Sequence, residues 1–250
     1  MVPEGTVRES FAIRAGSSDT LALIEGNRGL FDGKDAQGTH STAGLAKLLQ
    51  APIVLVIDCT KATRTVAALV HGCQTFDSDV HIAGAVLNRV AGRRHGQVIS
   101  EAIEQYCGVP VLGVIPKLFA EEVIPGRHLG LVPPAEYEEG GSLVQRLADI
   151  AEDYLDIDGL LGVAAGAGPL AAAPSQASES AGQEVRIGYF RDSVFTFYYP
   201  ENIEALARHG AELVPISSLT EGVLPEIDAL YIGGGFPETH AERLAANQGL

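Results

Sequence analysis

The sequence has 250 residues, of which 46% are hydrophobic, and it carries a formal net charge of −15 at pH 7. This negative charge argues against nucleic acid or an anionic membrane surface as the main partner. Tryptophan is absent and aromatic residues make up only 6% of the chain, so we expect an aliphatic core, as in parallel strands buried beneath helices.

The cysteines suggest a reducing compartment. Cys59, Cys73 and Cys107 show no CxxC spacing, and an odd number suits free thiols in a cytosol. No signal-peptide pattern and no apolar run near 18 residues is recognised. We therefore expect a soluble, cytoplasmic protein.

The first 160 residues alternate between strand and helix patterns. Short apolar runs rich in β-branched residues predict strands at Leu21–Ile24, Ile53–Asp58, Ile82–Asn88 and Val111–Ile115. Apolar residues at helical spacing predict helices at Thr42–Leu49, Thr63–Thr75, Gln97–Tyr106 and Gly140–Leu155. This order is typical of an α/β fold with a mostly parallel sheet, in which ligands bind at the carboxyl ends of the strands.

A stretch rich in Ala, Gly, Ser and Pro at residues 161–184 predicts a linker between two domains, 1–160 and 185–250. After the linker, strand patterns occur at Val185–Phe190, Ala211–Ile216 and Asp228–Gly234. Pro200 and Pro237 each indicate a helix start. So short a βαββα segment is too small for a complete open α/β sheet, and the second domain therefore looks unfinished.

Two acidic residues flank a glycine-rich loop after the first predicted strand. Glu25 ends that strand, and a carboxylate there can bind Mg²⁺ directly or through water. Asp32 lies across the loop, and the flexible backbone at Gly26 and Gly29 suits a nearby nucleotide phosphate. The alternatives remain open: Glu25 can be an ordinary capping or loop carboxylate, and Asp32 a turn former before Gly33.

The chain contains no phosphate-binding loop to accompany these acids. The nearest match to a Walker A motif is Gly33-Lys34, but Arg28 stands where glycine is needed and Asp35 where Ser or Thr is needed. We expect Glu25 and Asp32 to face a phosphate cradle that this sequence does not encode.

Polar residues also end the next predicted strands. The amide of Asn88 has the donor and the acceptor that pair with a purine, although a plain strand-end turn with Arg89 is the alternative. Asp58 could be a second metal ligand, but we favour a structural role because Glu25 already fills that position.

The stretch "GGGFPETH" at 233–240 ends a strand and opens a helix. Consecutive glycines let backbone N–H groups point into a cavity, which suits an oxyanion hole beside a nucleophile; a tight turn is the alternative. No cysteine follows Cys107 to serve as that nucleophile. The seven histidines show no HxxH or HExxH spacing, so zinc is not supported.

Taken together, these motifs resemble one family. "IEGNRGLFDG", "STAGLAKLLQAPIVLVID", "AGAVLNRV", "GVPVLGVIPK" and "RHLGLVPP" resemble the synthetase domain of cobyrinic acid a,c-diamide synthases. "FYYPENIEALARHGAEL" and "DALYIGGGFPETHAERLAANQ" resemble the start of the glutaminase domain of that family. The resemblance implies a synthetase domain with a P-loop/dethiobiotin-synthetase-like fold at 1–160, followed by a partial class I glutamine amidotransferase-like domain at 185–250.

The implied activity is the ATP-dependent amidation of the a- and c-carboxylates of cobyrinic acid in cobalamin biosynthesis. It proceeds through an acyl phosphate, with ammonia taken from glutamine. By motif position, Glu25 matches the Mg²⁺ ligand, Asp32 lies near the reacting groups and Asn88 lies at the adenine. The resemblance further implies oxyanion-hole glycines at Gly234 and Gly235. The remaining cofactor-binding candidates are Gly26, Gly29 and Arg89.

The sequence departs from the family at both ends. The phosphate loop of the family would lie upstream of Met1, and the glutaminase cysteine would follow Leu250. We therefore expect an internal fragment, which comes from a truncated gene model or a split gene. We expect this fragment to have little or no activity alone. The alternatives are a non-catalytic subunit, a split-enzyme half that needs a partner, and a partition-type ATPase. Sirohaem and nickel sirohydrochlorin are alternative substrates, and an exposed sheet edge would favour a homodimer or a partner subunit.

Overall fold

The computed structural model describes residues 2–15, 20–118, 126–127, 130–131, 140–168, 170 and 185–250. The described residues fall into two compact units. Those up to residue 170 belong to the first unit, and those from residue 185 onward belong to the second. Each unit contains a parallel sheet, which confirms the predicted α/β fold class.

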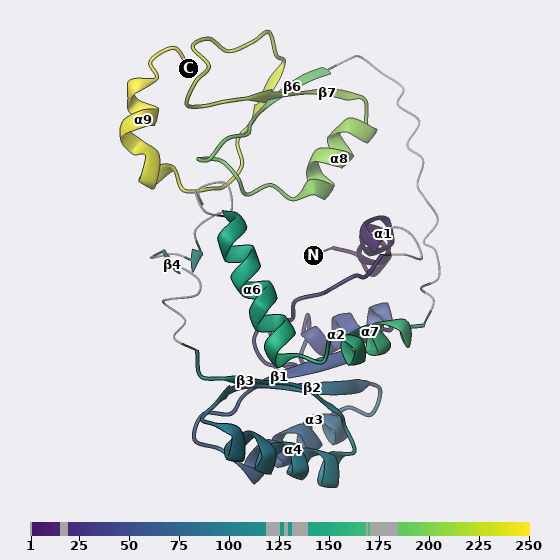
Figure 1. The fold of residues 1–250 in the computed structure, drawn as a ribbon. Helices are drawn as coiled ribbons and strands as arrows, with labels where there is room; N and C mark the ends of the chain where they lie inside the picture. The colour runs from purple at the N-terminus through teal and green to yellow at the C-terminus, as the bar shows by residue number, and fades with distance from the viewer. Residues whose placement is uncertain are drawn as a thin grey trace. The chain divides into compact units, whose positions relative to one another are not determined.

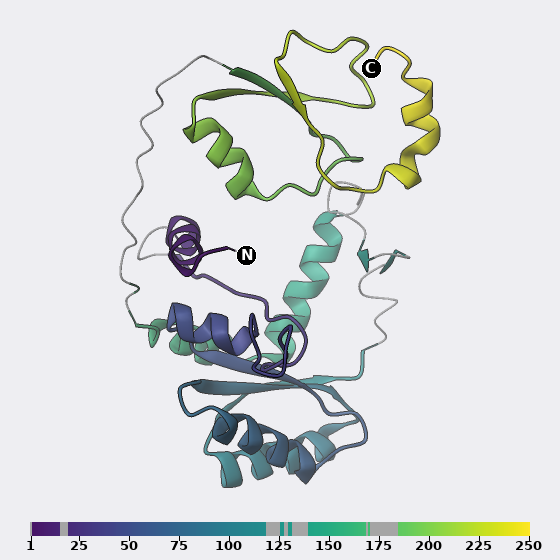
Figure 2. The same cartoon turned by 180° about the vertical axis from the view of Figure 1, so that it is seen from behind.

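The first unit is built on a three-stranded parallel sheet in the order β1-β2-β3. The strands are β1 (Ile53–Asp58), β2 (Ile82–Val90) and β3 (Val111–Pro116). Figure 1 shows that α3 (Arg64–Phe76) and α4 (Arg93–Cys107) cover one face. The helices on the other face, also visible from behind in Figure 2, are α2 (Thr42–Leu49), α6 (Gly140–Tyr154) and α7 (Ile157–Ala165).

The core of this unit forms where β2 meets the two helices beneath it. Leu87, at the centre of the sheet, is fully buried, as are Val70 of α3 and Ile99 and Ile103 of α4. Burying each such side chain stabilises the fold by roughly 1.5–3 kcal/mol. A central strand covered on both faces explains why the run "IAGAVL" is apolar throughout rather than alternating.

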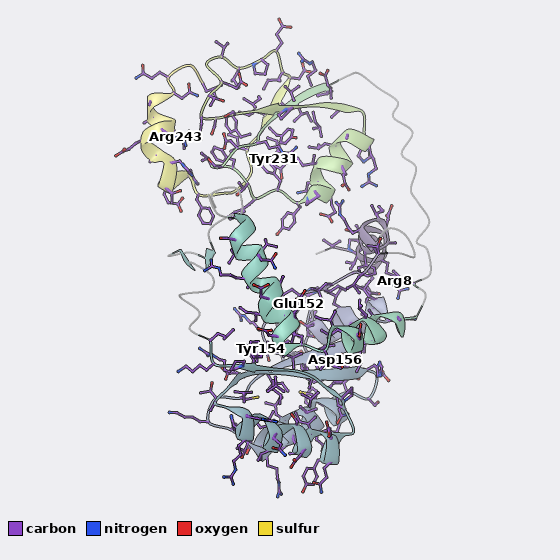
Figure 3. All side chains as sticks on the ribbon, in the orientation of Figure 1. Arg8, Glu152, Tyr154, Asp156, Tyr231 and Arg243 are labelled. Carbon is purple, nitrogen blue, oxygen red and sulfur yellow. The ribbon has the colours of Figure 1, made fainter. Side chains whose placement is uncertain are left out.

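The junction between α6 and α7 is fixed to strand β3 (Figure 3). The Asp156 N–H donates to Leu112 O at 2.8 Å, and Leu155 forms an antiparallel bridge with Gly113. A Cβ on Gly113 would lie 2.4 Å from Leu155 Cδ2 and 3.1 Å from Tyr154 O, so glycine allows this close approach. The Asp156 carboxylate then caps α7 by accepting the Gly159 N–H at 2.9 Å.

Helix α7 extends into the predicted linker, because residues 161–165 are helical. The Ala and Gly residues of this segment give little helical periodicity in the sequence. The helix is stabilised by its packing against β3, which the sequence pattern does not indicate. Of the remaining linker residues, 169 and 171–184 lie outside the described residues.

The strand predicted at Leu21–Ile24 is wrong. These residues have no regular secondary structure, and Leu21 and Leu23 are 58% and 93% exposed. A strand is stable only when a neighbour accepts and donates its backbone hydrogen bonds. Among the described residues β1 pairs with β2 alone, and Leu21–Ile24 pairs with no strand.

Three further elements of this unit were not predicted. They are the helix α1 (Glu4–Ala15) and the short antiparallel pair formed by β4 (Gly126–Arg127) and β5 (Gly130–Leu131). Within the described parts of the chain, none of the helices combines the length and the apolar character that crossing a membrane requires.

The second unit has a parallel sheet in the order β7-β6-β8. Its strands are β6 (Val185–Phe190), β7 (Ala211–Ile216) and β8 (Ala229–Tyr231). Its helices are α8 (Pro200–Arg208), the 3₁₀ turn η2 (Pro237–His240) and α9 (Ala241–Ala246). Pro200 and Pro237 occupy helix starts as predicted, because a proline there lacks only an N–H that would have no helical partner.

Candidate functional site

The loop that follows Glu25 is held against the start of helix α2. The Asn27 N–H donates to Thr42 Oγ1 at 3.2 Å, and the Ala43 N–H donates to Leu30 O at 2.9 Å. A Cβ on Gly26 would lie 3.0 Å from Thr42 Cγ2, so glycine lets the backbone pass close to the helix. The loop is therefore positioned by the helix terminus rather than by a strand.

Two further contacts anchor this region to the core. Phe31 packs against the core of the first unit, and its ring lies 4.7 Å from that of Phe76. Ser41, only 7% exposed, caps α2 by accepting the Gly44 N–H at 3.2 Å on its hydroxyl. The glycine-rich loop thus rests on a capped helix and an aromatic pair.

Asp32 closes a turn with Gly29. Its Oδ2 accepts the Gly29 N–H at 3.1 Å, and its own N–H donates to Gly29 O at 3.1 Å. A Cβ on Gly29 would lie 2.6 Å from Oδ2, so a larger residue at 29 would push the Asp32 carboxylate out of this turn. These contacts are those expected if Asp32 is a turn-forming residue. Its other carboxylate oxygen, Oδ1, has no partner among the described residues.

Glu25 is exposed, and within the described ranges its side chain makes no hydrogen bond or ion pair. No group of three or more metal-binding side chains occurs in the described part of the chain. Mg²⁺ in nucleotide sites typically takes one or two carboxylates together with phosphate oxygens and waters. A single unengaged carboxylate therefore fits the donor set of a nucleotide-bound Mg²⁺.

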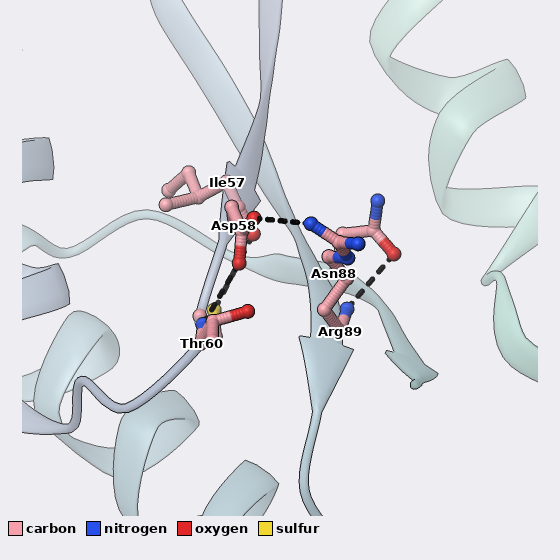
Figure 4. Close-up of polar contacts among 6 residues, drawn as sticks. Ile57, Asp58, Thr60, Asn88 and Arg89 are labelled. Atoms are coloured by element: carbon pink, nitrogen blue, oxygen red, sulfur yellow. Dashed lines mark hydrogen bonds and ion pairs between the residues drawn. The ribbon is translucent and has the colours of Figure 1, made fainter. Parts of the chain in front are cut away.

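A second polar group lies at the carboxyl ends of β1 and β2 (Figure 4). Asp58 and Asn88 are register partners across these strands. Arg89 Nη1 lies 3.1 Å from Asp58 Oδ2, and Thr60 donates its N–H to Asp58 Oδ1 at 2.8 Å. Hydrogen bonds from the Thr60 side chain and N–H, followed by Arg89, lower the pKa of Asp58 to about 2.

Both oxygens of Asp58 are engaged, which suits the structural role expected for it. Asn88 accepts the Arg89 N–H at 2.8 Å on Oδ1, while Arg89 adopts a left-handed backbone with φ of 58°. Among the described residues the Nδ2 donors of Asn88 have no partner, so they can pair with an outside acceptor such as a purine nitrogen. No described hydrogen bond or ion pair joins this group to the Glu25 loop, and a shared nucleotide site stays a prediction.

In the second unit, the predicted oxyanion glycines lie against residues 194–198. The Gly234 N–H donates to Phe197 O at 3.2 Å, so this amide is already engaged. A Cβ on Gly235 would lie 1.8 Å from Val194 O. The sequence did not predict a contact between these neighbours and the glycines, although the aromatic run "FTFYY" at 195–199 was the available signal.

Asp192 holds this aromatic run to the turn that follows β7. Its Oδ1 accepts the N–H groups of Val194 and Phe195 at 2.9 and 3.2 Å, and its Oδ2 accepts the N–H and hydroxyl of Ser218 at 2.6 and 2.7 Å. Burial raises the pKa of Asp192, but these hydrogen bonds outweigh it and the net shift is downward. A cavity of about 440 Å³ adjoins the run, with Arg191, Tyr198 and Glu204 in its lining.

Comparison with known proteins identifies both units. Residues 16–130 match the CobQ/CobB/MinD/ParA nucleotide binding domain, and residues 186–250 match the CobB/CobQ-like glutamine amidotransferase domain. A cobyrinate a,c-diamide synthase of Magnetococcus marinus is 47% identical over 97% of this chain and 53% of its own length. The chain belongs to the cobyrinate a,c-diamide synthase family.

Other members of the family agree with this assignment. The cobyrinate a,c-diamide synthase of Archaeoglobus fulgidus is 42% identical over all of this chain and 54% of its own length. That of Listeria monocytogenes is 40% identical over 94% of the chain and 52% of its own length. The chain spans about half the length of the curated relatives it matches. No solved structure matched the chain.

Proposed function

We propose that this chain takes part in the ATP-dependent, glutamine-hydrolysing amidation of the a- and c-carboxylates of cobyrinic acid, in cobalamin biosynthesis. The observation that carries the proposal is that a nucleotide-binding domain and a glutamine amidotransferase domain follow one another in a single chain. The relatives that match nearly all of this chain are cobyrinate a,c-diamide synthases.

The chemistry explains why both domains are needed. A carboxylate is a poor acceptor for ammonia, because its oxygen must first become a leaving group. Phosphorylation by ATP makes an acyl phosphate, and ammonia then displaces the phosphate to form the amide. The ammonia is released from glutamine or taken from solution, so cobyrinic acid, glutamine and ATP are the small-molecule partners that we propose.

We assign the nucleotide site to residues of the first unit. The unengaged Glu25 carboxylate would hold Mg²⁺, which when bound offsets the charge of the transferring phosphoryl group. The free amide donors of Asn88 would meet the adenine, with Arg89 held beside it by Asp58. Gly26 and Gly29 let the loop backbone approach the phosphates, and Asp32 would lie near the reacting groups.

We further propose that 1–160 acts as the synthetase domain, 161–184 as a linker and 185–250 as the glutaminase-like domain. Three free thiols, at Cys59, Cys73 and Cys107, support a cytoplasmic location. The net charge of −15 opposes nucleic acid as a partner.

A chimera tests the proposal. The matching region of the Magnetococcus marinus relative is replaced by this chain, and the product formed from cobyrinic acid, ATP, Mg²⁺ and amide-¹⁵N glutamine is analysed by mass spectrometry. We expect two ¹⁵N amides per corrin. The proposal would be refuted if a folded chimera failed to amidate cobyrinic acid both with glutamine and with ammonia. The same assay with sirohaem and with nickel sirohydrochlorin tests the alternative substrates.

Variants of the chimera test the metal assignment. Glu25→Gln should lower turnover by about a hundredfold or more, comparable to the loss of one group that stabilises developing charge. Gln37→Ala, on the exposed part of the same loop region, is the matched control and should leave turnover unchanged. Equal activity of Glu25→Gln and the control would exclude Glu25 as the Mg²⁺ ligand.

A further inference from the structure

A short segment of the second unit crosses the glycine turn and occupies most of its amides. We call residues 194–198 the aromatic strap and residues 233–236 the glycine turn. The Gly233 N–H donates to the Tyr198 hydroxyl at 2.9 Å, and the Gly234 N–H donates to Phe197 O at 3.2 Å. The Phe236 N–H donates to Val194 O at 2.9 Å. Three of the four amides of the turn are therefore bonded to the strap.

The remaining amide belongs to Gly235. Among the described residues its N–H has no acceptor, whereas a Cβ at this position would lie 1.8 Å from Val194 O. The strap therefore lies in close contact with the Gly235 backbone. In the described structure, the Gly235 N–H is the one amide of the turn that has no acceptor. An oxyanion hole requires such a donor, because an N–H already bonded to a carbonyl must break that bond before it can serve the transition state.

Tyr198 anchors the strap at the end that faces Gly233. Its ring packs edge-on against those of Tyr189 and Tyr231, at centroid distances of 5.8 and 5.2 Å. Its hydroxyl donates to Tyr231 O at 3.4 Å while accepting the Gly233 N–H. Burial raises the pKa of Tyr198, so the hydroxyl keeps its proton at neutral pH and fills both hydrogen-bonding roles.

The rest of the strap is equally fixed. The Phe197 N–H returns a hydrogen bond to Gly234 O at 2.9 Å, and the Phe197 ring packs edge-on against Phe236 at 5.1 Å. Asp192 holds the N–H groups of Val194 and Phe195, as described above. The strap is therefore a rigid support for the glycine turn and not a loose loop lying over it.

On the basis of the glutamine-hydrolysing function proposed above, we propose that Gly235 alone supplies the oxyanion-hole N–H of this turn and that Tyr198 is its positioning residue. The Gly234 amide, which the family resemblance also implied, then serves as part of the support. Tyr198 acts through Gly233 and touches no reacting atom.

Amide exchange in the 250-residue chain tests the arrangement. With ¹⁵N-glycine labelling, we expect slow exchange at Gly233 and Gly234 and fast exchange at Gly235. Tyr198→Phe keeps the ring but removes the acceptor, so protection of Gly233 should fall at least about tenfold. Tyr199→Phe is the matched control, because Tyr199 is 75% exposed and its hydroxyl touches none of these amides. Protection of Gly235 equal to that of Gly234 would overturn the inference.

Glutamine hydrolysis by the chimera tests the consequence. Tyr198→Phe should lower kcat for glutamine about three- to tenfold with little change in KM, because the loosened turn presents the Gly235 N–H less well in the transition state. Amidation with free ammonia should not change, and Tyr199→Phe should alter neither. Unchanged kcat in Tyr198→Phe would overturn this inference alone, whereas a wild-type chimera that hydrolyses no glutamine would overturn the proposed function as well.

Discussion

Arg89 forms an ion pair with Asp58 across two neighbouring parallel strands, with 3.1 Å between Nη1 and Oδ2. Both side chains are about half exposed, so the pair contributes little to global stability. Its consequence is local, because Arg89 directly follows Asn88 and the pair fixes the backbone that presents the Asn88 amide. The ion pair thereby orders the carboxyl edge of the first sheet.

The pKa of Asp58 should depend on its two neighbours. Thr60→Val and Arg89→Met should each raise it from about 2 towards the ordinary value of 3.8, because each removes a donor to the charged carboxylate. Carboxyl-carbon NMR titration of the 250-residue chain measures the pKa directly. Arg94→Met, an exposed arginine on the next helix, is the control and should leave it unchanged. An unaltered pKa in both variants would show that these contacts are not kept in solution.

The same shift predicts a pH dependence. Because the folded pKa of Asp58 lies below the unfolded one, its contribution to stability is present above about pH 4 and is lost as the pH falls towards 2. Asp58→Asn removes this component, so the variant should lose less stability between pH 4 and pH 2 than the wild type. Denaturant unfolding at each pH measures the difference, and parallel curves for the two proteins would contradict it.

The central strand carries the core of the first unit. Leu87→Ala should lower its free energy of unfolding by about 2–5 kcal/mol, because it removes a fully buried side chain and leaves a cavity. Leu23→Ala is the control and should change stability by less than about 0.5 kcal/mol, since Leu23 is exposed. A large effect of Leu23→Ala would mean that residues 21–24 are buried in solution, against the structure.

The cap of α2 supports the Glu25 loop. Ser41→Ala should destabilise the first unit by about 1 kcal/mol, because the Gly44 N–H loses its acceptor. Ser78→Ala, at an exposed turn position, serves as the comparison and should have almost no effect on chemical denaturation. Equal effects of the two substitutions would argue against the cap.

Asp192 should be the most sensitive polar residue of the second unit. Asp192→Ala should destabilise it by about 2–4 kcal/mol, since several donors, including the buried Ser218, lose a charged acceptor. Glu226→Gln, an exposed acid in the same unit, should be neutral. Thermal unfolding of both variants checks this, and a neutral Asp192→Ala would show that the strap does not depend on the hydrogen bonds of Asp192.

Much of the fold could be predicted from the sequence, because the strongest patterns coincide with the most buried elements. The strands at Ile53–Asp58, Val185–Phe190 and Ala211–Ile216 occur at the predicted residues. Each run is rich in the β-branched and other apolar residues that favour a strand. Helix α4 begins earlier than predicted, at Arg93, since its polar first turn carries no apolar periodicity.

The errors lie where a local pattern needs a distant partner. Residues 21–24 are as apolar as a buried strand, yet their backbone pairs with no strand in the described structure. Residues 161–165, the second half of α7, fall in the predicted linker, because Ala and Gly residues carry little periodicity and the packing of the helix on β3 cannot be read from them. Hydrogen-bond pairing and packing decide such cases, and neither is encoded within a window of ten residues.

By itself the sequence determined the family and the fold class, since motifs keep residue types and spacing, and it named the candidate positions for the chemistry. The tertiary structure decided which of these groups are already engaged. Asp32 is turned back onto Gly29, Asp58 is held by Arg89, and Gly234 is bonded to the strap, whereas Glu25 and Gly235 keep unengaged groups in the described structure. The physical reason is that a hydrogen bond such as that between Gly233 and Tyr198 joins residues 35 positions apart, and only folding brings them within reach.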